Sequence, residues 1–600
     1  MALSDPIQSR RAGRAGADDL HSRATLVEVL RERAARQGDT VALNFLADGQ
    51  EIGSTLDYRA LDGRARALAT VLRRHAAPGD RALILLPSGP DYLIAFFACF
   101  YASVIAVPAY PPQAMRPHHV ARLEGMIADS TPRFLLTDRE HAPEVWGLLV
   151  GDRSLRILSV DEVGDEARNG VGAGAGVGAR AEWTSDLPRA DDVAFLQYTS
   201  GSTSAPKGVE ITHANLMDNQ RVLSRGFGVT ADDVFVSWLP LYHDMGLMTG
   251  LTLSVFWGCP LYLMAPQHFL ARPARWLEAL HRYGGTFSGG PDFAYRLCCE
   301  RVNDKLLDRL DLSRWHVAFC GAEPVRADTM ADFAERFAPA GFKVEALGPS
   351  YGLAEATLGV SLPRRGRRYT TLTVDAAALA ANRIVPGTGV ALVGCGRPPE
   401  PDTVGIFDPR SGDPCEDGLV GEVWVAGGSV ARGYWENPEA TREVFVRRPG
   451  EPAERVWLRT GDLGFLVDGE LFITGRCKDL IILHGENCYP QDIEKVVESA
   501  VAAVRKGRVA VFAVDRDGRE GIGVAVEVGR GEQRKHRPQD LVEAIDGAVV
   551  DAVQEPASLI ALLEPGALPK TTSGKLQRSA CRQGIAGGDI AAYHVYRRPL

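Results

Sequence analysis

Residues 197–212 read Gln-Tyr-Thr-Ser-Gly-Ser-Thr-Ser-Ala-Pro-Lys-Gly-Val-Glu-Ile-Thr. Apolar residues on either side, from Val193 and again from Gly208, have strand character, so the small polar residues between them are expected to form a turn. Gly201 lets the backbone approach a ligand closely, and Lys207 supplies a cation. Hydroxyl groups come from Thr199, Ser200, Ser202, Thr203 and Ser204. This composition suits a loop that binds phosphates.

The same composition is common in flexible surface loops, and the residues alone leave both interpretations open. The stretch differs from the Walker nucleotide-binding pattern, because Lys207 follows Pro206 instead of a glycine. No helix-forming stretch begins directly at the lysine, as that pattern would require. The phosphate-binding interpretation therefore depends on other motifs in the chain.

The length and charge of the chain narrow the possible functions. At 600 residues it exceeds the usual size of one hydrophobic core, which predicts two or more domains. Lys and Arg total 67 against 76 Asp and Glu, which gives a net charge of −9 and argues against nucleic acid as a partner. The 10 cysteines are scattered without a CxxC pair, as is typical of a protein of the reducing cytoplasm.

No segment has the run of about 18 apolar residues that a transmembrane helix needs, so a soluble protein is expected. Residues 92–108 come closest, but Cys99, Tyr101 and Ser103 interrupt them. A buried helix that runs into a strand is predicted there instead. Residues 1–20 are rich in Arg, Gly and Ala without an apolar core, which predicts a disordered lead and no secretory signal.

Helical and extended patterns alternate along the chain. Leu26–Ala35 and Asp57–His75 have helical spacing, while Arg81–Leu86 and Val104–Val107 are short apolar strands. This alternation predicts an α/β fold with a largely parallel sheet. Further short strands and a helix at Gln539–Val553 indicate a smaller unit near the C-terminus.

The wording Tyr-Thr-Ser-Gly-Ser-Thr followed by Pro-Lys-Gly-Val resembles the signature loop of the adenylate-forming enzymes. These include acyl-CoA synthetases, luciferases, peptide-synthetase adenylation domains and fatty acyl-AMP ligases. The resemblance implies a large N-terminal AMP-binding domain of mixed sheets and helices, over residues 21–477, which activates a carboxylic acid with ATP. It also implies a small mobile α+β lid domain over residues 478–600.

Further motifs follow in the family's order and imply the nucleotide contacts. Gly321, Ala322 and Glu323 resemble the adenine-contacting loop, and Tyr351, followed by Gly352, would stack on adenine. Taken alone, Asp462 could simply cap a turn. By resemblance it binds the ribose hydroxyls, and Arg476 lies near the nucleotide.

The resemblance also assigns residues to the acyl group, the metal and the moving lid. His243 would lie between the acyl pocket and the reacting carboxylate, although a histidine at a strand end is more often structural. Glu355 would hold Mg²⁺, Lys575 would be the mobile catalytic lysine, and Lys478 would be the hinge. The residues expected to border the acyl tunnel are Ser288, Gly289, Gly290 and Pro291, where the two glycines would let an alkyl chain pass beside backbone.

The chemistry explains why cations are needed. A carboxylate that attacks the α-phosphate of ATP is repelled by it, so Mg²⁺ on Glu355, Lys207 and Lys575 would share the stabilisation of charge. A carboxylate is already ionised at neutral pH, so no general base is required.

Within the superfamily the chain resembles the fatty acyl-AMP ligases most. Pro240–Leu247 and Tyr489–Glu494 follow that group's wording, and extra chain at about residues 360–392 resembles its insertion, which disfavours free CoA. Val374, Ala377 and Ala378 recur at helical spacing in this insertion and predict a short packed helix. The expected acceptor is therefore the phosphopantetheine thiol of an acyl carrier protein.

Two alternatives stay open from the sequence. Glu486 stands in the Gly-Glu-Asn wording of many CoA ligases, which favours a fatty acyl-CoA ligase that uses free CoA. A binding protein without catalytic activity is the other alternative, although no motif lysine or carboxylate is missing.

Overall fold

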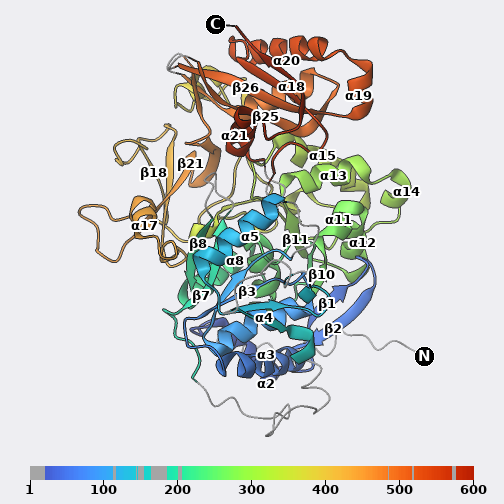
Figure 1. Ribbon diagram of the computed structural model, residues 1–600, viewed down its shortest axis with the longest axis vertical. Coiled ribbons are helices and arrows are strands. Elements are labelled where there is room, and N and C mark those ends of the chain that lie inside the picture. Colours follow the sequence, from blue (N-terminus) through green and yellow to red (C-terminus); the bar gives the residue numbers. More distant parts are fainter. Residues whose placement is uncertain are drawn as a thin grey trace.

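The structure is a computed structural model that describes residues 20–111, 117–143, 145, 155–163, 186–199, 206–483, 486–516, 519–570 and 576–599. The lead at residues 1–19, the loop residues Ser200, Gly201, Ser202 and Thr203, and Lys575 lie outside the described residues. A smaller C-terminal unit lies on a larger body, as Figure 1 shows.

The first sheet of the larger body has six strands in the order β6-β5-β3-β4-β7-β8. Every neighbouring pair is parallel except β7 and β8, which form a hairpin. The strands are β3 (Arg81–Ile84), β4 (Ile105–Pro108), β5 (Phe134–Thr137), β6 (Arg156–Ser159), β7 (Val193–Thr199) and β8 (Lys207–Thr212). The buried helix α4 (Pro90–Ala102) precedes β4, which confirms the helix and strand predicted for residues 92–108.

The second sheet has seven strands in the order β13-β12-β11-β9-β10-β1-β2. Only the β1–β2 pair is antiparallel. Its strands are β1 (Val41–Leu46), β2 (Ile52–Asp57), β9 (Phe235–Ser237), β10 (Leu261–Met264), β11 (Phe287–Gly290), β12 (Val317–Cys320) and β13 (Leu347–Pro349). Gly290 lies opposite Cys320, and Cys320 lies opposite Pro349, so the carboxyl ends of these strands form a common edge.

One hydrophobic core joins these sheets and their helices. Parallel strands that are covered on both faces consist almost entirely of apolar residues. These strands could therefore be recognised in the sequence as short apolar runs. The helices of this core include α2 (Leu26–Arg36), α3 (Tyr58–Arg73), α8 (His213–Phe227), α12 (Ala274–Tyr283), α13 (Asp292–Arg301) and α15 (Ala327–Phe337).

A third sheet, of five strands, follows in the chain and has its own core. The middle strand β21 pairs with β19, β20 and β22 in an antiparallel arrangement. The strands are β18 (Val404–Phe407), β19 (Gly421–Ala426), β20 (Phe445–Val446), β21 (Trp457–Val467) and β22 (Glu470–Arg476). These segments carry Asp462 and Arg476 towards the common edge of the second sheet.

The insertion contains a short helix, as its spacing predicts, but the helix begins later in the chain and follows a strand. Residues Thr371–Val374 form strand β16, which pairs with β17 (Val390–Val393), and only Ala376–Ala380 form a helix, α16. Val374 and Ala378 are buried as expected, but Ala377 is exposed and Leu379 is buried in its place. The predicted short packed helix is therefore present as α16, but Val374 precedes it in strand β16, where the side-chain period is 2 instead of 3.6.

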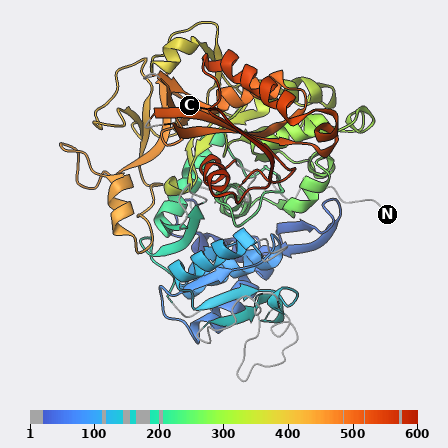
Figure 2. The ribbon, with the colours of Figure 1, turned by 45° about the horizontal axis from the view of Figure 1, so that its top comes forward.

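The C-terminal unit is a four-stranded sheet in the order β25-β26-β27-β28. Its elements are β25 (Val504–Arg516), β26 (Arg519–Val528), β27 (Leu559–Leu563), β28 (Ala592–Arg597), α18 (Pro490–Ala500), α19 (Arg530–Lys535), α20 (Pro538–Val553) and α21 (Arg578–Gly587). Helices α18 and α20 pack on a core made only of residues after 480 (Figure 2). The predicted α/β body and α+β C-terminal unit are therefore confirmed. Among the described residues, no helix is long and apolar enough to cross a membrane.

Candidate active site

The common edge of the seven-stranded sheet collects residues that are far apart in the sequence. His243 follows β9, Pro291 follows β11, Gly321 follows β12, and Tyr351 follows β13. Because these strands are parallel, their carboxyl ends lie side by side, which is where open α/β sheets bind ligands. The sheet therefore brings four of the sequence motifs to one place.

The loop after β12 lies directly against the segment after β13. Ser350 donates its backbone N–H to the carbonyl of Cys320 at 2.8 Å. A carbon added to Gly321 would lie 2.8 Å from the carbonyl oxygen of Ser350, and Ala322 has φ +68°. The loop at Gly321–Glu323 is therefore tightly turned and packed against the segment after β13.

Glu323 of this loop anchors the next element. Its carboxylate accepts a hydrogen bond from the backbone N–H of Phe293 at 2.7 Å, in the first turn of α13. Burial and the neighbouring Glu323 raise the pKa of Asp292 to about 7. The Asp292 side chain nevertheless accepts hydrogen bonds from Arg326 N–H (2.9 Å) and Thr329 Oγ1 (3.0 Å), and so fixes the start of α15.

Tyr351, Asp462 and Arg476 are joined by hydrogen bonds. The Tyr351 hydroxyl donates to Asp462 Oδ2 at 2.6 Å, and Arg476 Nε donates to Asp462 Oδ1 at 2.9 Å. Burial and the Asp462 carboxylate raise the pKa of the Tyr351 hydroxyl, so it stays a hydrogen-bond donor. A carboxylate has about four acceptor positions, so Asp462 retains acceptors for further hydroxyl groups. The structure thus unites three of the predicted nucleotide residues.

Lys207 and Glu355 meet at a residue that the sequence did not single out, Tyr434. The Tyr434 hydroxyl donates to Glu355 Oε1 at 2.9 Å, and Lys207 Nζ lies 5.2 Å from the centre of the Tyr434 ring. Tyr434 reaches this position because its segment pairs with β8 through a bridge to Val209 and a hydrogen bond from Trp435 N–H to Gly208 O. No motif spacing could reveal this pairing between segments more than 200 residues apart.

The surroundings of Glu355 fit a bound divalent cation. Burial raises the pKa of the Glu355 carboxyl, and the hydrogen bond from Tyr434 opposes this rise. A cation beside this carboxylate would offset the cost of burying its charge. The described residues contain no cluster of three or more metal-binding side chains. One carboxylate together with substrate phosphates is the set that Mg²⁺ commonly uses, so the residues suit Mg²⁺ better than Zn²⁺.

The β7–β8 hairpin fixes the ends of the predicted phosphate loop. Thr199 lies directly opposite Lys207, and Tyr198 lies opposite Gly208. Both Thr199 and Lys207 are half-buried, at the end of the sheet. The hairpin therefore places the lysine beside the root of the loop, and the loop residues themselves lie outside the description.

The residues predicted to border the acyl tunnel are buried, with Ser288, Gly289 and Gly290 in strand β11 and Pro291 directly after it. The Ser288 hydroxyl donates to the carbonyl of Val236 at 2.5 Å and accepts from Trp276 Nε1 at 2.8 Å, so it joins strands and helix within the wall. A carbon added to Gly289 would meet Phe319, and one added to Gly290 would lie 2.8 Å from the Trp238 ring. The two glycines are therefore adjacent to aromatic rings, and the passage of an alkyl chain beside them stays a prediction.

His243 is half-buried at the start of the short helix α9 (Asp244–Gly246). Its ring centre lies 5.1 Å from that of Tyr242, and a π-helix, Leu247–Thr252, follows. Such wide turns occur frequently at functional sites. Trp238, on the preceding segment, has a buried Nε1 without a hydrogen-bond partner.

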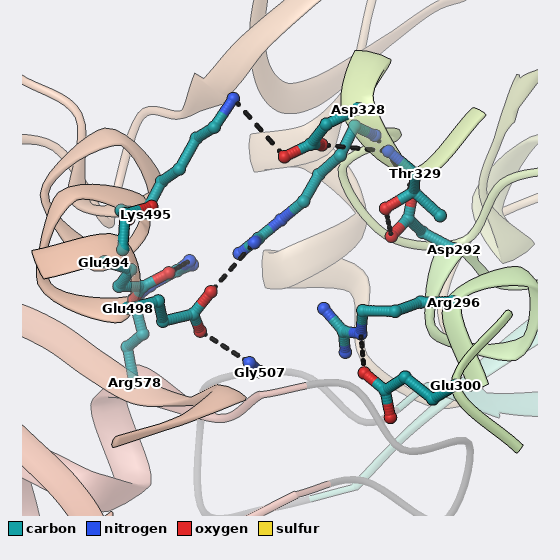
Figure 3. Close-up of polar contacts among 12 residues, drawn as sticks. Asp292, Arg296, Glu300, Asp328, Thr329, Glu494, Lys495, Glu498, Gly507 and Arg578 are labelled. Carbon is teal, nitrogen blue, oxygen red and sulfur yellow. Dashed lines mark hydrogen bonds and ion pairs between the residues drawn. The ribbon is translucent and has the colours of Figure 1, made fainter. Parts of the chain in front are cut away.

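Polar contacts join the C-terminal unit to the larger body (Figure 3). Arg326 Nη1 donates to Glu498 Oε2 at 2.9 Å, and the other carboxylate oxygen of Glu498 accepts the Gly507 N–H at 2.6 Å. Lys495 Nζ lies 3.7 Å from Asp328 Oδ2. Arg326 belongs to the Gly-Ala-Glu-Pro-Val-Arg motif, but its partner could not be deduced from sequence. The hinge residue predicted from the resemblance, Lys478, is exposed.

Comparison with known proteins identifies the family of this chain. A family model described as "AMP-binding enzyme" matches residues 30–435. The medium-chain-fatty-acid–[acyl-carrier-protein] ligase JamA of Moorena producens is 40% identical over 582 residues, which cover 94% of this chain and 96% of JamA. FadD21 of Mycobacterium tuberculosis, whose name describes a fatty-acid–CoA ligase, is 37% identical over 580 residues, which cover 93% of this chain and 97% of FadD21.

Solved structures extend the similarity to the fold. A structure from a study of fatty acyl-adenylate ligases from E. coli and L. pneumophila is 32% identical and has a TM-score of 0.84. The match covers 95% of this chain and 99% of that one, so both units are included. The resemblance found in the sequence is therefore confirmed, and the chain belongs to the AMP-binding enzyme family, among its fatty acid ligases.

Proposed function

We propose that this enzyme activates a medium- or long-chain fatty acid with ATP and passes the acyl group to the phosphopantetheine thiol of an acyl carrier protein. The observation that carries the proposal is that Tyr351, Asp462 and Arg476 are joined by hydrogen bonds. In the same body, Tyr434 contacts both Lys207 and Glu355. The name of JamA, which describes a carrier-protein ligase, supports the choice of acceptor.

The first step joins two anions, so its main obstacle is charge. An oxygen of the fatty carboxylate bonds to the α-phosphorus of ATP while the bond to pyrophosphate breaks. Lys207 and Lys575 would stabilise the charge that develops, and Glu355 would hold a Mg²⁺ ion that neutralises the triphosphate. Positioning and electrostatic stabilisation are sufficient, because the carboxylate has no proton to lose.

The remaining residues would bind the two substrates. Asp462 would accept hydrogen bonds from the ribose, Tyr351 and Gly352 would border the adenine, and Gly321–Glu323 would cover its other side. The hydroxyl-rich loop at Thr199–Thr203 would bind phosphates. His243 would lie next to the reacting carboxylate, and Gly289, Gly290 and Pro291 would border the alkyl chain.

The proposal also divides the chain into two domains that move relative to each other. Residues 21–477 would be the AMP-binding domain, with an insertion at about residues 360–392. Residues 478–600 would form a lid that pivots at Lys478 and delivers Lys575, which would protect the reactive acyl-adenylate from water. The free state of the ten cysteines supports a cytoplasmic location.

Free CoA is the alternative acceptor. The exposed Glu486, in the Gly-Glu-Asn wording, and the name of FadD21 favour it. Carrier protein and CoA present the same phosphopantetheine thiol, so only a direct comparison of the two acceptors separates them.

The test is to measure pyrophosphate release from ATP and fatty acids of graded length, and then acyl transfer. We expect pyrophosphate release with medium or long chains, and faster acylation of a phosphopantetheinylated carrier protein than of CoA. The Lys575→Ala variant should bind ATP normally but form acyl-adenylate orders of magnitude more slowly, because the lysine acts on developing charge. Absence of pyrophosphate release would contradict adenylation, and rapid acyl-CoA formation would favour the CoA ligase.

A further inference from the structure

Several segments of the C-terminal unit end at one edge of its sheet. Val504, at the start of β25, lies opposite Val528, at the end of β26, and Glu527 lies opposite Leu563, at the end of the parallel strand β27. Residues 529–534 and 564–570 therefore leave the sheet on the same side, next to the irregular start of β25 at residues 505–508. Figure 1 shows α19 on this side of the unit, above α13 and α15.

This edge carries four exposed cations, Arg505, Lys506, Arg530 and Arg534, which we call the basic edge. None of the four forms an ion pair with a residue that the structure describes. The neighbouring Arg508, by contrast, forms an ion pair with the buried Glu527 at 3.4 Å. The basic edge is therefore locally positive, although the whole chain has a net charge of −9.

An open cavity of about 530 Å³ adjoins the basic edge. Its lining consists of Arg530, Gln533, Arg534, Pro538, Glu564 and Tyr593. The Tyr593 hydroxyl oxygen is buried and has no hydrogen-bond partner, whereas the Glu564 carboxylate lies 3.5 Å from Gln533 Nε2. Two arginines and a free hydroxyl give the cavity donors that an anionic group could use.

One end of the basic edge, at Arg505 and Lys506, lies beside the junction between the two units. Gly507 follows Lys506 directly, and its N–H donates to Glu498, which Arg326 of the larger body also contacts (Figure 3). The carbonyl of Gly507 accepts a hydrogen bond from Lys570 Nζ at 2.8 Å. A macromolecule bound at Arg505 and Lys506 would therefore lie next to the contact between the C-terminal unit and the larger body.

We propose that the basic edge is the docking surface for the carrier protein, and that it binds acidic side chains on the surface of that protein. The inference rests on the proposed function, because it concerns the partner of the second step. A net negative enzyme repels an acidic partner on average, so productive encounter requires a local positive surface. The basic edge offers this surface, and the cavity beside Arg530 and Arg534 would take one of the acidic side chains.

Charge variants of the full-length enzyme test the proposal. The pairs Arg530→Gln/Arg534→Gln and Arg530→Glu/Arg534→Glu form a graded series, and Arg505→Glu/Lys506→Glu gives an independent second site. The matched control is Arg73→Gln/Arg74→Gln at the far end of α3. The probe is a phosphopantetheinylated acyl carrier protein that the unaltered enzyme acylates, with pyrophosphate release measured beside acyl transfer.

We expect the KM for the carrier to rise about threefold to tenfold on neutralisation and more than tenfold on charge reversal, with pyrophosphate release unchanged. The carrier lacking its phosphopantetheine arm should compete with the complete carrier for the unaltered enzyme and lose this ability against the variants. An unchanged KM in all three variants would overturn the proposal. So would an equal loss of transfer to free pantetheine, because the edge would then act on the arm or on catalysis. If the unaltered enzyme acylates no carrier at all, the proposed function fails instead.

Discussion

Tyr434 links the two charged residues on which adenylation is proposed to depend. Its hydroxyl holds one oxygen of Glu355, and its ring face lies against Lys207. A tyrosine can do both because its hydroxyl is a hydrogen-bond donor while its ring attracts cations. One side chain thus sets the distance between the proposed metal ligand and the proposed phosphate-binding lysine.

Replacing Tyr434 by Phe should raise the Mg²⁺ concentration needed for half-maximal pyrophosphate release by about tenfold. The hydrogen bond to the carboxylate is lost, and such bonds contribute roughly 1.5 to 3 kcal/mol. Because this bond opposes the burial that raises the pKa of Glu355, its loss should raise that pKa further. The acid limb of the activity profile should therefore move to higher pH, since more of Glu355 is protonated at a given pH.

High Mg²⁺ should return the acid limb of Tyr434→Phe towards that of the unaltered enzyme, because the cation competes with the proton. Tyr434→Ala, which also removes the ring from Lys207, should be slower still. A Tyr434→Phe variant with unchanged Mg²⁺ dependence and unchanged pH profile would show that the tyrosine only fills space.

At Asp462 the structure refines an expectation from the sequence. Asp462→Asn should raise the KM for ATP by about tenfold to a hundredfold, since a hydrogen bond to a charged group contributes roughly 1.5 to 3 kcal/mol. Because Asp462 also holds Tyr351 and Arg476, some thermal stability should be lost as well. Arg476→Gln removes one of these contacts but keeps the carboxylate, and so shows how much of the loss of thermal stability comes from that ion pair. Misfolding of Asp462→Asn with normal ATP affinity per folded molecule would make the residue purely structural.

At the scale of elements, sequence patterns predicted the regular parts of the fold well. Short apolar runs that follow helical patterns predicted the parallel sheets correctly, because both faces of such strands are buried. The insertion was predicted less well, since Thr371–Val374 pairs with β17 and leaves only one helical turn after it. The candidate site was predictable where a motif follows a strand, as at Gly321 and Tyr351. Tyr434 and Glu498 were not, because their roles arise from pairing with distant segments.

The insertion nevertheless contacts the chain beyond the proposed hinge. Val374 and Leu379 share a buried cluster with Phe465, Phe472 and Tyr489. Asn487 Nδ2 donates to Asn382 Oδ1 at 2.8 Å. These contacts would favour one arrangement of the lid over another, because an equilibrium shifts by the difference in contact energy between its states.

Asn382→Ala should increase acyl transfer to free CoA about twofold to tenfold while acyl-adenylate formation is unchanged. The expected size corresponds to one exposed hydrogen bond of about 0.5 to 1.5 kcal/mol. Deleting residues 369–379 should act in the same direction and more strongly, although it also removes buried side chains. Asn487→Ala should match Asn382→Ala, and the double variant should add nothing further. Unchanged CoA transfer in a folded deletion variant would exclude a restraining role for the insertion.

At the scale of the whole molecule, two ion pairs at the seam differ greatly in burial. The side chain of Glu498 is 3% exposed, whereas Lys495 and Asp328 are 49% and 48% exposed. An exposed pair contributes little, while removal of one partner from a buried pair is costly. The Arg326–Glu498 pair should therefore dominate the adhesion between the units.

Arg326→Gln should shift the population towards more open arrangements, because it leaves the buried Glu498 carboxylate without its cation. Small-angle scattering should report a larger radius of gyration, and a protease should cut the chain faster near Lys478. Lys495→Gln is the matched control and should leave both measurements close to those of the unaltered protein. Equal effects from the two variants would show that burial does not distinguish the pairs.

The irregular start of β25 has a consequence for exchanging parts between enzymes. The strand advances from Val504 to Val509 while β26 moves only from Val528 to Val526, and the surplus residues bring Gly507 to Glu498 and Lys570. A C-terminal unit in which β25 and β26 pair regularly could fold equally well. It would lack the Gly507 backbone N–H that holds Glu498 beside Arg326 of the larger body. Chimeras built from this enzyme and a relative should therefore assemble only when the grafted unit keeps these surplus residues, whatever its overall identity.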